Sequence, residues 1–545
     1  MCSVAECVSV CMGIARGQAR DAGRCASQDS SFLPCFHARR PSLACNCWFC
    51  VAAIVPLPRQ PLRQIKTFLL ALRKHSIIMM NQSLDFQPEL LQRFDISGPR
   101  YTSYPTADRM HSGFGARDYA EELRRRAQRP DEPVSLYFHV PFCETLCYYC
   151  GCNKIPTKNH GRSAPYLDSV EQELRLIAGL LQARLPVTQL HWGGGTPTFL
   201  NDEEAARLMA MTREHFDLQP GGEFSIEIDP RKVNEARVAH LARLGFNRMS
   251  VGVQDFAPEV QQAVNRIQSV EETRLVIDAA RANGFGSISL DLIYGLPLQN
   301  LDSFARTLDQ VIEISPDRLS LYSYAHLPHI FKPQRRINAE DLPTAEVKLG
   351  LLGLAIRRLE EAGYVYIGMD HFAKPGDELA RAQREGKLHR NFQGYSTQAE
   401  LDLLAFGVSS ISNVGNCYAQ NAKTIDEYTE MLAFGKLPTA RGVHLTPEDH
   451  LRRTAIQRLM CDFQLDLAAL ADEFKVDAAA TFALDLQRLK PLEDAGLVVR
   501  EGPQGLRVQV TPQGRLLVRI VAMQFDGYLH QPREQLLQPR YSRVI

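Results

Sequence analysis

Short β-rich segments alternate with helical segments along the chain from Val134 onward. The hydrophobic and polar pattern predicts six strands, at residues 134–140, 187–192, 223–229, 247–253, 287–293 and 318–323. Strands that alternate regularly with helices are typical of an α/β fold with a parallel sheet. Six β/α units are too few for a closed eight-stranded barrel, so we expect an open, partial (β/α)6 TIM-like barrel with its site at the carboxyl ends of the strands.

Helical periodicity and start signals support the segments between these strands. Apolar residues recur at helical spacing after the first strand, at Val170, Leu174, Ile177 and Leu181. Asn201 precedes Glu204 by three residues, and Ser269 precedes Glu272 by three residues. This spacing is typical of a capping box, in which two side chains satisfy the free N–H groups at a helix start.

The pattern divides the chain into four regions. Residues 79–133 form an N-terminal segment, residues 134–444 form the barrel and its extension, and residues 445–545 form a mostly α-helical C-terminal domain. Short apolar runs at 496–499 and 506–510 make this last domain winged-helix-like. We expect the N-terminal run at 100–106 and the C-terminal domain to lie over or beside the barrel mouth, with the latter acting as a lid.

The first 78 residues differ from the rest of the chain. They hold eight of the fourteen cysteines and ten Arg or Lys against three acidic residues, without a sustained period. A transit peptide and a disulfide-forming segment are possible interpretations. Because Met79 and Met80 follow directly and regular patterning begins after them, we favour a disordered extension from an upstream start, outside the function.

Charge and hydropathy restrict the classes of function. The 545 residues include 62 Lys or Arg and 62 Asp or Glu, so no overall basicity favours a nucleic-acid partner. No apolar run reaches the roughly 18 residues of a membrane span. The composition predicts a soluble, cytoplasmic protein.

The chemistry of the chain is indicated by Cys143, Cys147 and Cys150. The spacing C-x3-C-x2-C places three thiolates on one short loop. Three thiolates can hold three irons of a [4Fe-4S] cluster and leave the fourth iron without a protein ligand. Such an iron can bind a small molecule, which favours an enzyme.

Other uses of this cysteine cluster are possible. A four-thiolate zinc site usually contains two separated C-x2-C pairs, and no second pair follows downstream. A disulfide framework is typical of small secreted scaffolds. Cys152 lies two residues from Cys150, too close to reach the fourth iron, so we interpret it as a non-ligand that lines the same site.

Polar groups recur where the predicted strands end. Gly193–Gly195 follow the second strand, where exposed N–H groups can bind a carboxylate and carbonyls can accept from an amine, although a tight turn explains such a triplet equally well. Glu227 lies on an apolar strand, where burial is costly without a polar partner. The alternative is that Glu227 faces solvent or pairs with Arg231. The further polar positions are Gln254, Asp255, Asp291, Tyr324 and His326.

The cysteine spacing resembles the signature of the radical S-adenosylmethionine superfamily. More specifically, residues from about 98 to 545 resemble the oxygen-independent coproporphyrinogen III oxidase family. The motifs that carry this resemblance are GPRYTSYPT (98–106), CGCNK (150–154), WGGGTPT (192–198), GVQDF (252–256), DLIYGLP (291–297), GMDHF (368–372), HRNFQGY (389–395) and CYAQN (417–421). The related haem chaperone-like proteins, which bind and transfer haem, are the alternative. They typically carry Cys-Asp-Phe at 150–152 and lack the PRYTSYP run.

The resemblance implies a [4Fe-4S] cluster on Cys143, Cys147 and Cys150 and two S-adenosylmethionine molecules. The residues implied for the first cofactor molecule are Tyr137, Gly194, Glu227 and Ile411. Those implied for the second are Tyr149, Gly195, Thr196, Gln254, Arg266, Asp291 and Ala325. Ala325 and Ile411 rest on the family alone, because nothing in their chemistry selects them.

The implied reaction is the anaerobic oxidative decarboxylation of two propionates of coproporphyrinogen III to vinyl groups, giving protoporphyrinogen IX in haem biosynthesis. A 5′-deoxyadenosyl radical would abstract a hydrogen from each propionate, and no catalytic residue is assigned beyond the cluster and cofactor. Candidate substrate or active-site residues are Cys152, Arg100 and Gln393. The implied partners are the substrate and an electron donor such as a flavodoxin or ferredoxin. We expect a monomer.

Overall fold

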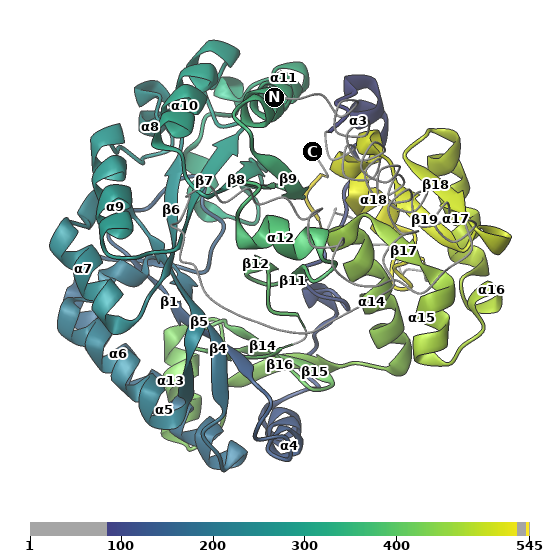
Figure 1. The fold of residues 1–545 in the computed structure, drawn as a ribbon. Coiled ribbons are helices and arrows are strands. Elements are labelled where there is room, and N and C mark those ends of the chain that lie inside the picture. Colours follow the sequence, from purple (N-terminus) through teal and green to yellow (C-terminus); the bar gives the residue numbers. More distant parts are fainter. Residues whose placement is uncertain (1–83, 400, 531–540, 544–545) are drawn as a thin grey trace, which may run out of the picture. The chain divides into compact units, whose positions relative to one another are not determined.

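The computed structural model describes residues 84–399, 401–530 and 541–543, so the predicted N-terminal extension lies outside the described residues. A single large sheet organises these residues, with the strand order β16-β15-β14-β13-β1-β4-β5-β6-β7-β8-β10-β9 (Figure 1). Six neighbouring strands of this sheet are parallel and match the predicted ones: β1 (Val134–Val140), β4 (Pro186–Gly194), β5 (Asp217–Ile228), β6 (Arg248–Gln254), β7 (Ser287–Tyr294) and β8 (Arg318–Ser323). The partial barrel is therefore confirmed.

Helices connect the parallel strands and cover their outer side (Figure 1). They are α5 (Ser163–Leu181), α6 (Asp202–His215), α7 (Glu235–Leu244), α8 (Pro258–Ala263), α9 (Val270–Ala282), α10 (Leu301–Ile314) and α11 (Ala345–Glu361). Both predicted capping boxes form, at the starts of α6 and α9. The predicted apolar stripe of α5 is buried.

The sheet extends beyond the predicted strands. β13 (Asp402–Phe406) adds a parallel strand beside β1, followed by the antiparallel β14 (Ile411–Val414), β15 (Cys417–Asn421) and β16 (Thr439–His444). At the other edge, β10 (His371–Ala373) pairs antiparallel with β8, and β9 (Val365–Gly368) pairs antiparallel with β10. β5 starts at Asp217, six residues earlier than predicted, because an irregularity at Gly221 and Gly222 interrupts its pattern.

The parallel strands alternate between an apolar outer face and a polar inner face. On β6, Met249, Val251 and Val253 are buried, whereas the intervening Ser250 and Gln254 are partly accessible. The inner side chains of β5, β7 and β8 are also polar and line cavities inside the sheet. A polar interior is unlike the branched apolar filling of a closed TIM barrel, and it leaves room for a polar ligand.

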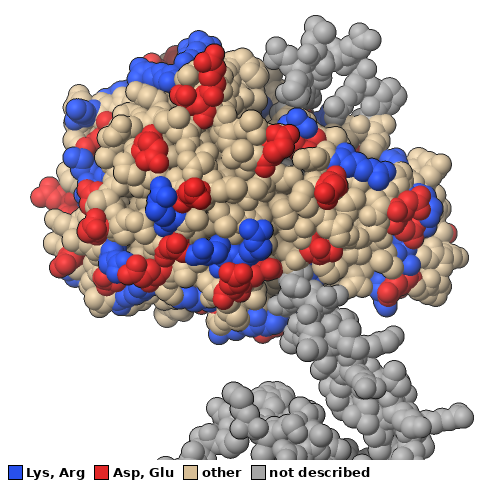
Figure 2. Space-filling view, turned by 90° about the horizontal axis from the view of Figure 1, so that it is seen from above, with Lys and Arg blue, Asp and Glu red and all other residues tan. Residues whose placement is uncertain are grey.

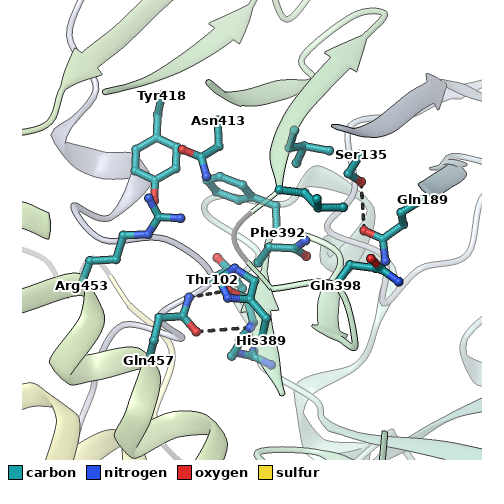
Figure 3. Close-up of a pocket in the computed structure, with 14 residues that line it drawn as sticks. Thr102, Ser135, Gln189, His389, Phe392, Gln398, Asn413, Tyr418, Arg453 and Gln457 are labelled. Carbon is teal, nitrogen blue, oxygen red and sulfur yellow. Dashed lines mark hydrogen bonds between the residues drawn. The ribbon is translucent and has the colours of Figure 1, made fainter. Parts of the chain in front are cut away.

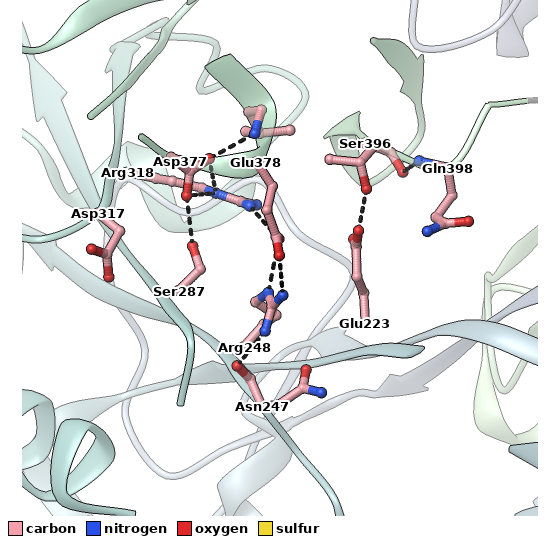
Figure 4. A network of polar contacts seen from close by, with 12 residues as sticks. Glu223, Asn247, Arg248, Ser287, Asp317, Arg318, Asp377, Glu378, Ser396 and Gln398 are labelled. Carbon is pink, nitrogen blue, oxygen red and sulfur yellow. Dashed lines mark hydrogen bonds and ion pairs between the residues drawn. The ribbon is translucent and has the colours of Figure 1, made fainter. Parts of the chain in front are cut away.

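A network of ion pairs closes the interior at the amino ends of the strands (Figure 4). The helix α12 (Glu378–Arg384) is held there by its N-cap Asp377, which accepts from Arg318 Nε at 2.9 Å and Ser287 Oγ at 3.1 Å. Glu378 accepts from Arg248 Nη2 at 2.6 Å. Because these contacts satisfy the groups at this end, the opposite, carboxyl ends remain for a ligand.

A hairpin of β11 (His389–Asn391) and β12 (Gly394–Ser396) follows α12 and contributes to the interior. Gln189 of β4 donates to Ser396 Oγ at 2.9 Å. The hairpin also packs against α14 (Pro447–Asp462), the first helix of the C-terminal region.

The C-terminal region combines helices with a small three-stranded sheet of order β17-β19-β18. Its elements after α14 are β17 (Gln464–Asp466), α15 (Leu467–Phe474), α16 (Ala478–Thr481), α17 (Ala483–Asp494), β18 (Val498–Glu501), β19 (Arg507–Val510) and α18 (Val518–Met523). Its winged-helix likeness stays a prediction. α14 packs on β9 and β11, so the region lies beside the barrel at the open edge of the sheet.

The N-terminal segment contributes α3 (Pro88–Phe94) and α4 (Ala116–Arg126), and α13 (Ile425–Ala433) packs on α5. The run at 98–106 contacts the C-terminal region, since Tyr101 donates to Asp526 at 3.0 Å and Gly527 N donates to Tyr104 at 3.0 Å. The two flanking regions predicted to lie near the barrel therefore contact each other.

Acidic and basic side chains are interspersed on the face seen in Figure 2. No helix in the described part of the chain is both long and apolar enough to cross a bilayer. Cys417 and Cys461 are buried, as expected for small core side chains.

We expect Asp377→Ala to destabilise the protein. The Asp377 side chain is 4% exposed, and its removal leaves Arg318 without its nearest carboxylate. Loss of one partner of a buried pair should lower the free energy of unfolding by about 2–4 kcal/mol, measured by urea denaturation. Glu385→Ala, which removes an exposed pair with Lys387, is the control and should leave the free energy of unfolding nearly unchanged. Equal effects of the two substitutions would contradict the closing role of Asp377.

Candidate functional site

The three motif cysteines lie on the loop that leaves β1 at its carboxyl end. Two short strands tie the loop together, because β2 (Phe142–Cys143) pairs in parallel with β3 (Ile155–Pro156). Cys143 and Cys147 are buried, Cys150 is partly accessible, and none of them forms a disulfide. The protein's own backbone therefore holds the loop in place.

The geometry of these thiols suits a cluster better than a single ion. Within the described residues, no three His, Cys, Asp or Glu side chains converge closely enough to hold one metal ion. In a [4Fe-4S] cluster each thiolate binds a different iron, so the sulfur atoms lie further apart than around zinc. The three thiols on one loop are available for such a cluster.

Polar groups surround the thiol sulfur atoms. Thr196 Oγ1 donates to Cys143 Sγ at 3.4 Å, and Arg266 Nη1 lies 3.6 Å from Cys147 Sγ. Burial raises the pKa of the Cys143 thiol to about 11. A hydrogen bond from Cys152 lowers the pKa of Cys150 to about 6, despite its burial. Cys152 thus contacts the Cys150 sulfur and lines the same pocket, and its assignment as a non-ligand stays a prediction.

The glycine run fixes the cysteine loop to β4. Gly195 N donates to Val140 O at 2.8 Å, and a Cβ atom at Gly195 would lie 2.6 Å from Pro141 O. Gly194 N donates to Glu227 at 3.1 Å. The expectation that these N–H groups are free for a carboxylate is therefore wrong, because the protein itself uses them. The glycines are needed for close packing against the loop.

A pocket of about 220 Å³ lies between the cysteine loop and the carboxyl ends of β4–β7. It is lined by Cys152 and the three motif cysteines together with most of the residues predicted for the cofactor, namely Tyr149, Gly194, Gly195, Thr196, Glu227, Gln254, Arg266 and Asp291. Residues far apart in the sequence thus meet in one site.

Three predicted residues do not line this pocket. Tyr137 lies nearby on β1, with its ring stacked on His191 at 5.8 Å between centroids. The carbonyl of Ala325 accepts from Gln334, whose amide also donates to the carbonyl of Tyr149. Ile411 begins β14 and packs against a separate apolar cluster that contains Met110 and Tyr418.

Glu227 is held as an acceptor in the pocket. Its Oε1 lies 3.3 Å from His191 Nε2, and its Oε2 accepts from Gly194 N. Burial is the largest single effect and opposes ionisation, but the hydrogen bond and charge of His191 and the hydrogen bond from Gly194 N together lower the pKa of Glu227. Pairing with Arg231 does not occur, because Arg231 binds Asp229 at 2.5 Å. A carboxylate with a low pKa suits the positively charged sulfonium and amino groups of S-adenosylmethionine.

Sequence reasoning missed the role of Asp229 and Arg231. Asp229 lies between Arg231 and Arg266, and although burial opposes it, the charge of Arg266 lowers the Asp229 pKa to about 2. The sequence signal was the period-two alternation of β5: Ser225, Glu227 and Asp229 are each two residues apart, so their side chains lie on the same, inner face. Asp229 holds the guanidinium groups of Arg231 and Arg266 beside Cys147 Sγ, where they would stabilise negative charge on a cluster.

Asp291 lines the other side of the pocket. Ser250 Oγ donates to it at 3.0 Å, and burial raises its pKa to about 6. The same two residues and Glu227 also line a second cavity of about 170 Å³ inside the barrel. Polar side chains therefore continue from the cysteine loop into the interior.

The other candidate substrate residues lie deeper. Gln393, at the hairpin turn, lines the second cavity, and its buried Nε2 has no hydrogen-bond partner. Arg100 forms an ion pair with Asp370, so its charge is already partly balanced. Neither residue lines the pocket beside the cysteines.

Comparison with known proteins identifies relatives along most of the chain. Residues 137–311 match the model of the radical SAM superfamily, and residues 445–517 match the HemN C-terminal domain. Oxygen-independent coproporphyrinogen III oxidases of Pseudomonas aeruginosa and Escherichia coli are each 48% identical, covering 86% of this chain and 100% of the relative. A solved structure described as "Coproporphyrinogen III oxidase (HemN) from Escherichia coli is a Radical SAM enzyme" matches with a TM-score of 0.77 and 47% identity, covering 82% of this chain and 100% of that one.

Cysteine replacement tests the three-ligand arrangement. We expect Cys143→Ser, Cys147→Ser and Cys150→Ser each to abolish assembly of the cluster, because each removes one of three thiolates. Cys152→Ser should keep the iron content and the visible absorption of the wild-type cluster. Iron and sulfide analysis and an absorption spectrum after anaerobic reconstitution measure these two properties. Loss of the cluster in Cys152→Ser would contradict the arrangement.

Glu227→Gln tests the charge of the pocket. A charge-assisted hydrogen bond contributes about 1.5–3 kcal/mol, so its loss should weaken S-adenosylmethionine binding about 10- to 150-fold. Equilibrium dialysis with the reconstituted protein measures this affinity. Glu223→Gln is a matched control, because Glu223 lies on the same face of β5 but bonds Thr397 at the far end of the strand. Equal affinity losses in both variants would refute a specific role for Glu227.

Proposed function

The chain belongs to the oxygen-independent coproporphyrinogen III oxidase family, and on that basis we propose that it converts coproporphyrinogen III to protoporphyrinogen IX. Each of two propionate side chains loses a hydrogen atom from its β-carbon. It also loses CO2 and one electron, and a vinyl group remains. The observation that carries this proposal is the 48% identity to oxidases over their full length. The chain is a radical S-adenosylmethionine oxidoreductase with a [4Fe-4S] cluster.

The residues of the site fit these groups. When bound, the cluster and S-adenosylmethionine supply a 5′-deoxyadenosyl radical that can take a hydrogen atom from the propionate. Cys143, Cys147 and Cys150 would hold the cluster, and the adjoining carboxylates of Glu227 and Asp291 would bind the cationic and hydroxyl groups of the cofactor. The arginines beside Cys147 stabilise negative charge there.

Two cofactor molecules remain part of the proposal. Tyr137, Gly194, Glu227 and Ile411 are proposed for the first molecule. The set proposed for the second is Tyr149, Gly195, Thr196, Gln254, Arg266, Asp291 and Ala325. Support comes from the pocket, which is lined by eight of these eleven residues, whereas Tyr137, Ala325 and Ile411 rest on the family resemblance.

A radical site needs protection from water, and the amino end of the barrel contributes to it. Asp377 and Glu378 close the amino ends of the strands, and the β11–β12 hairpin fills the interior between them and the pocket. A radical reacts with any accessible C–H bond, so an enclosed site is needed.

Partners and location follow from the chemistry. We propose a low-potential electron donor such as a flavodoxin or ferredoxin, a monomeric enzyme and a cytoplasmic setting. Cluster thiolates require a reducing compartment, which supports the last of these. The haem-transfer alternative is not favoured, because the identified relatives are oxidases.

An anaerobic assay tests the activity. The reconstituted, reduced protein is mixed with S-adenosylmethionine and coproporphyrinogen III, and the oxidised products are separated by chromatography. We expect first a monovinyl and then a divinyl porphyrin, with release of CO2. Tight haem binding without a vinyl product would overturn the proposed function in favour of the haem-transfer relative.

A further inference from the structure

A buried guanidinium group on β11 has no carboxylate partner. Arg390 is 2% exposed and forms no ion pair with any described residue. Its Nε donates to the carbonyl of Arg100 at 3.4 Å, its Cζ lies 4.8 Å from the ring centre of Tyr395, and its buried Nη1 has no hydrogen-bond partner. An equally buried arginine elsewhere, Arg126 at 1% exposed, is paired with Asp402 at 2.7 Å.

An unpaired buried cation is unfavourable in the free protein. Removing a guanidinium from water is costly, and only a nearby anion or several hydrogen bonds compensate for this cost. Arg390 has no nearby anion among the described residues, and its guanidinium makes only part of its possible hydrogen bonds. Such a group is retained where a ligand supplies the missing charge, which makes Arg390 a candidate anion-binding residue.

The recess beside Arg390 carries a second arginine. Arg390 and Arg453 line one recess with His389, Asn413 and Tyr418, and no Asp or Glu among the described residues lines it. Figure 3 shows this recess with Arg453, His389, Asn413 and Tyr418 labelled. The Arg453 guanidinium makes no hydrogen bond or ion pair within the described part of the chain and lies 5.9 Å from the Tyr418 ring. Burial and the charge of Arg453 lower the pKa of His389 to about 4, so that ring stays neutral. The two arginines thus give the recess a net positive charge.

The recess is held in place by the C-terminal region. Gln457 of α14 accepts from Arg390 N at 3.2 Å and donates to Arg390 O at 2.5 Å, the two bonds drawn from Gln457 in Figure 3. These contacts fix the two peptide units of β11 that flank the Cα atom of Arg390. The guanidinium itself is positioned by its hydrogen bond to Arg100 O and by the Tyr395 ring, and a side chain held in this way loses less entropy on binding.

The recess, with a volume of about 10 Å³, is a neighbour of two larger cavities. It shares Gln189 and Asn391 with the cavity inside the barrel. It shares His389, Arg453 and Gln457 with a groove of about 780 Å³ beside α14. The groove has the volume of a site for a large ligand, and the barrel cavity adjoins the cysteine pocket through Glu227, Ser250 and Asp291.

We propose that Arg390, assisted by Arg453, binds the carboxylate of a propionate group that is not reacting, and so orients the tetrapyrrole for decarboxylation of another. This inference rests on the proposed function, which supplies a substrate with four carboxylates. Guanidinium groups bind carboxylates through two parallel hydrogen bonds, so a fixed arginine determines orientation as well as affinity. The reacting propionate itself belongs at the cysteine pocket.

Steady-state kinetics and thermal unfolding of reconstituted variants test this proposal. In Arg390→Gln and Arg453→Gln, KM for coproporphyrinogen III should rise about tenfold or more, with kcat changed less than about threefold. Arg390→Lys should recover part of the loss, because the charge is kept. Cluster absorption and S-adenosylmethionine affinity should match the wild type in all three.

The unfolding temperature separates binding from structure. Without substrate, Arg390→Gln should unfold at the wild-type temperature or above it, because an uncompensated buried charge is removed. Arg126→Gln is the matched control: it breaks a buried pair, so it should unfold at a lower temperature and keep the wild-type KM. Arg453 is partly accessible and makes no hydrogen bonds, so Arg453→Gln reports on binding even if Arg390→Gln fails to fold.

Three outcomes would count against these ideas. A KM within twofold of the wild type in Arg390→Gln and Arg453→Gln overturns the inference, while wild-type turnover leaves the proposed function standing. A large fall in the unfolding temperature of Arg390→Gln with unchanged KM in Arg453→Gln also overturns it, since it assigns Arg390 a structural role. A wild-type protein that gives no vinyl product defeats the proposed function itself.

Discussion

The polar interior of the parallel sheet is the constraint on which the rest of the structure depends. Each parallel strand buries an apolar face under helices and directs polar side chains inward. Polar groups removed from water must be paired within the protein or with a ligand. At the amino ends of the strands this pairing is internal, through Asp377 and Glu378. At the carboxyl ends, Glu227 and Asp291 face a pocket instead.

The same requirement explains the order of the sites along the barrel. The closed end carries balanced ion pairs, and the cysteine end carries thiols with two guanidinium groups nearby. Between them, the hairpin that follows α12 brings Gln393 and Arg390 toward the interior from a part of the chain far from the cysteines. The α12 ion pairs therefore do more than close the barrel, because they fix the start of the segment that completes its interior.

Rigidity of the cysteine loop comes from backbone packing. Gly195 contacts the carbonyls of Pro141 and Phe142 so closely that any side chain would collide with them. Gln457 holds the backbone of β11 in place by two hydrogen bonds from outside the barrel. In both places the groups that would meet ligands are oriented by contacts that involve no ligand. Such preorganisation reduces the cost of binding and supports a reaction whose radical must be precisely placed.

The sequence alone determined the six parallel strands, both capping boxes and the three-thiolate loop, because these depend on short-range periodicity and spacing. The family resemblance also predicted most of the residues around the pocket, among them Tyr149, Thr196, Gln254 and Arg266. Only the tertiary structure decided that Glu227 pairs with His191, that the glycine N–H groups are occupied, that Ile411 lies apart, and that Arg390 is buried without a carboxylate. These are relations between side chains distant in sequence, and their free energies depend on burial and on which charges meet, which no local pattern encodes.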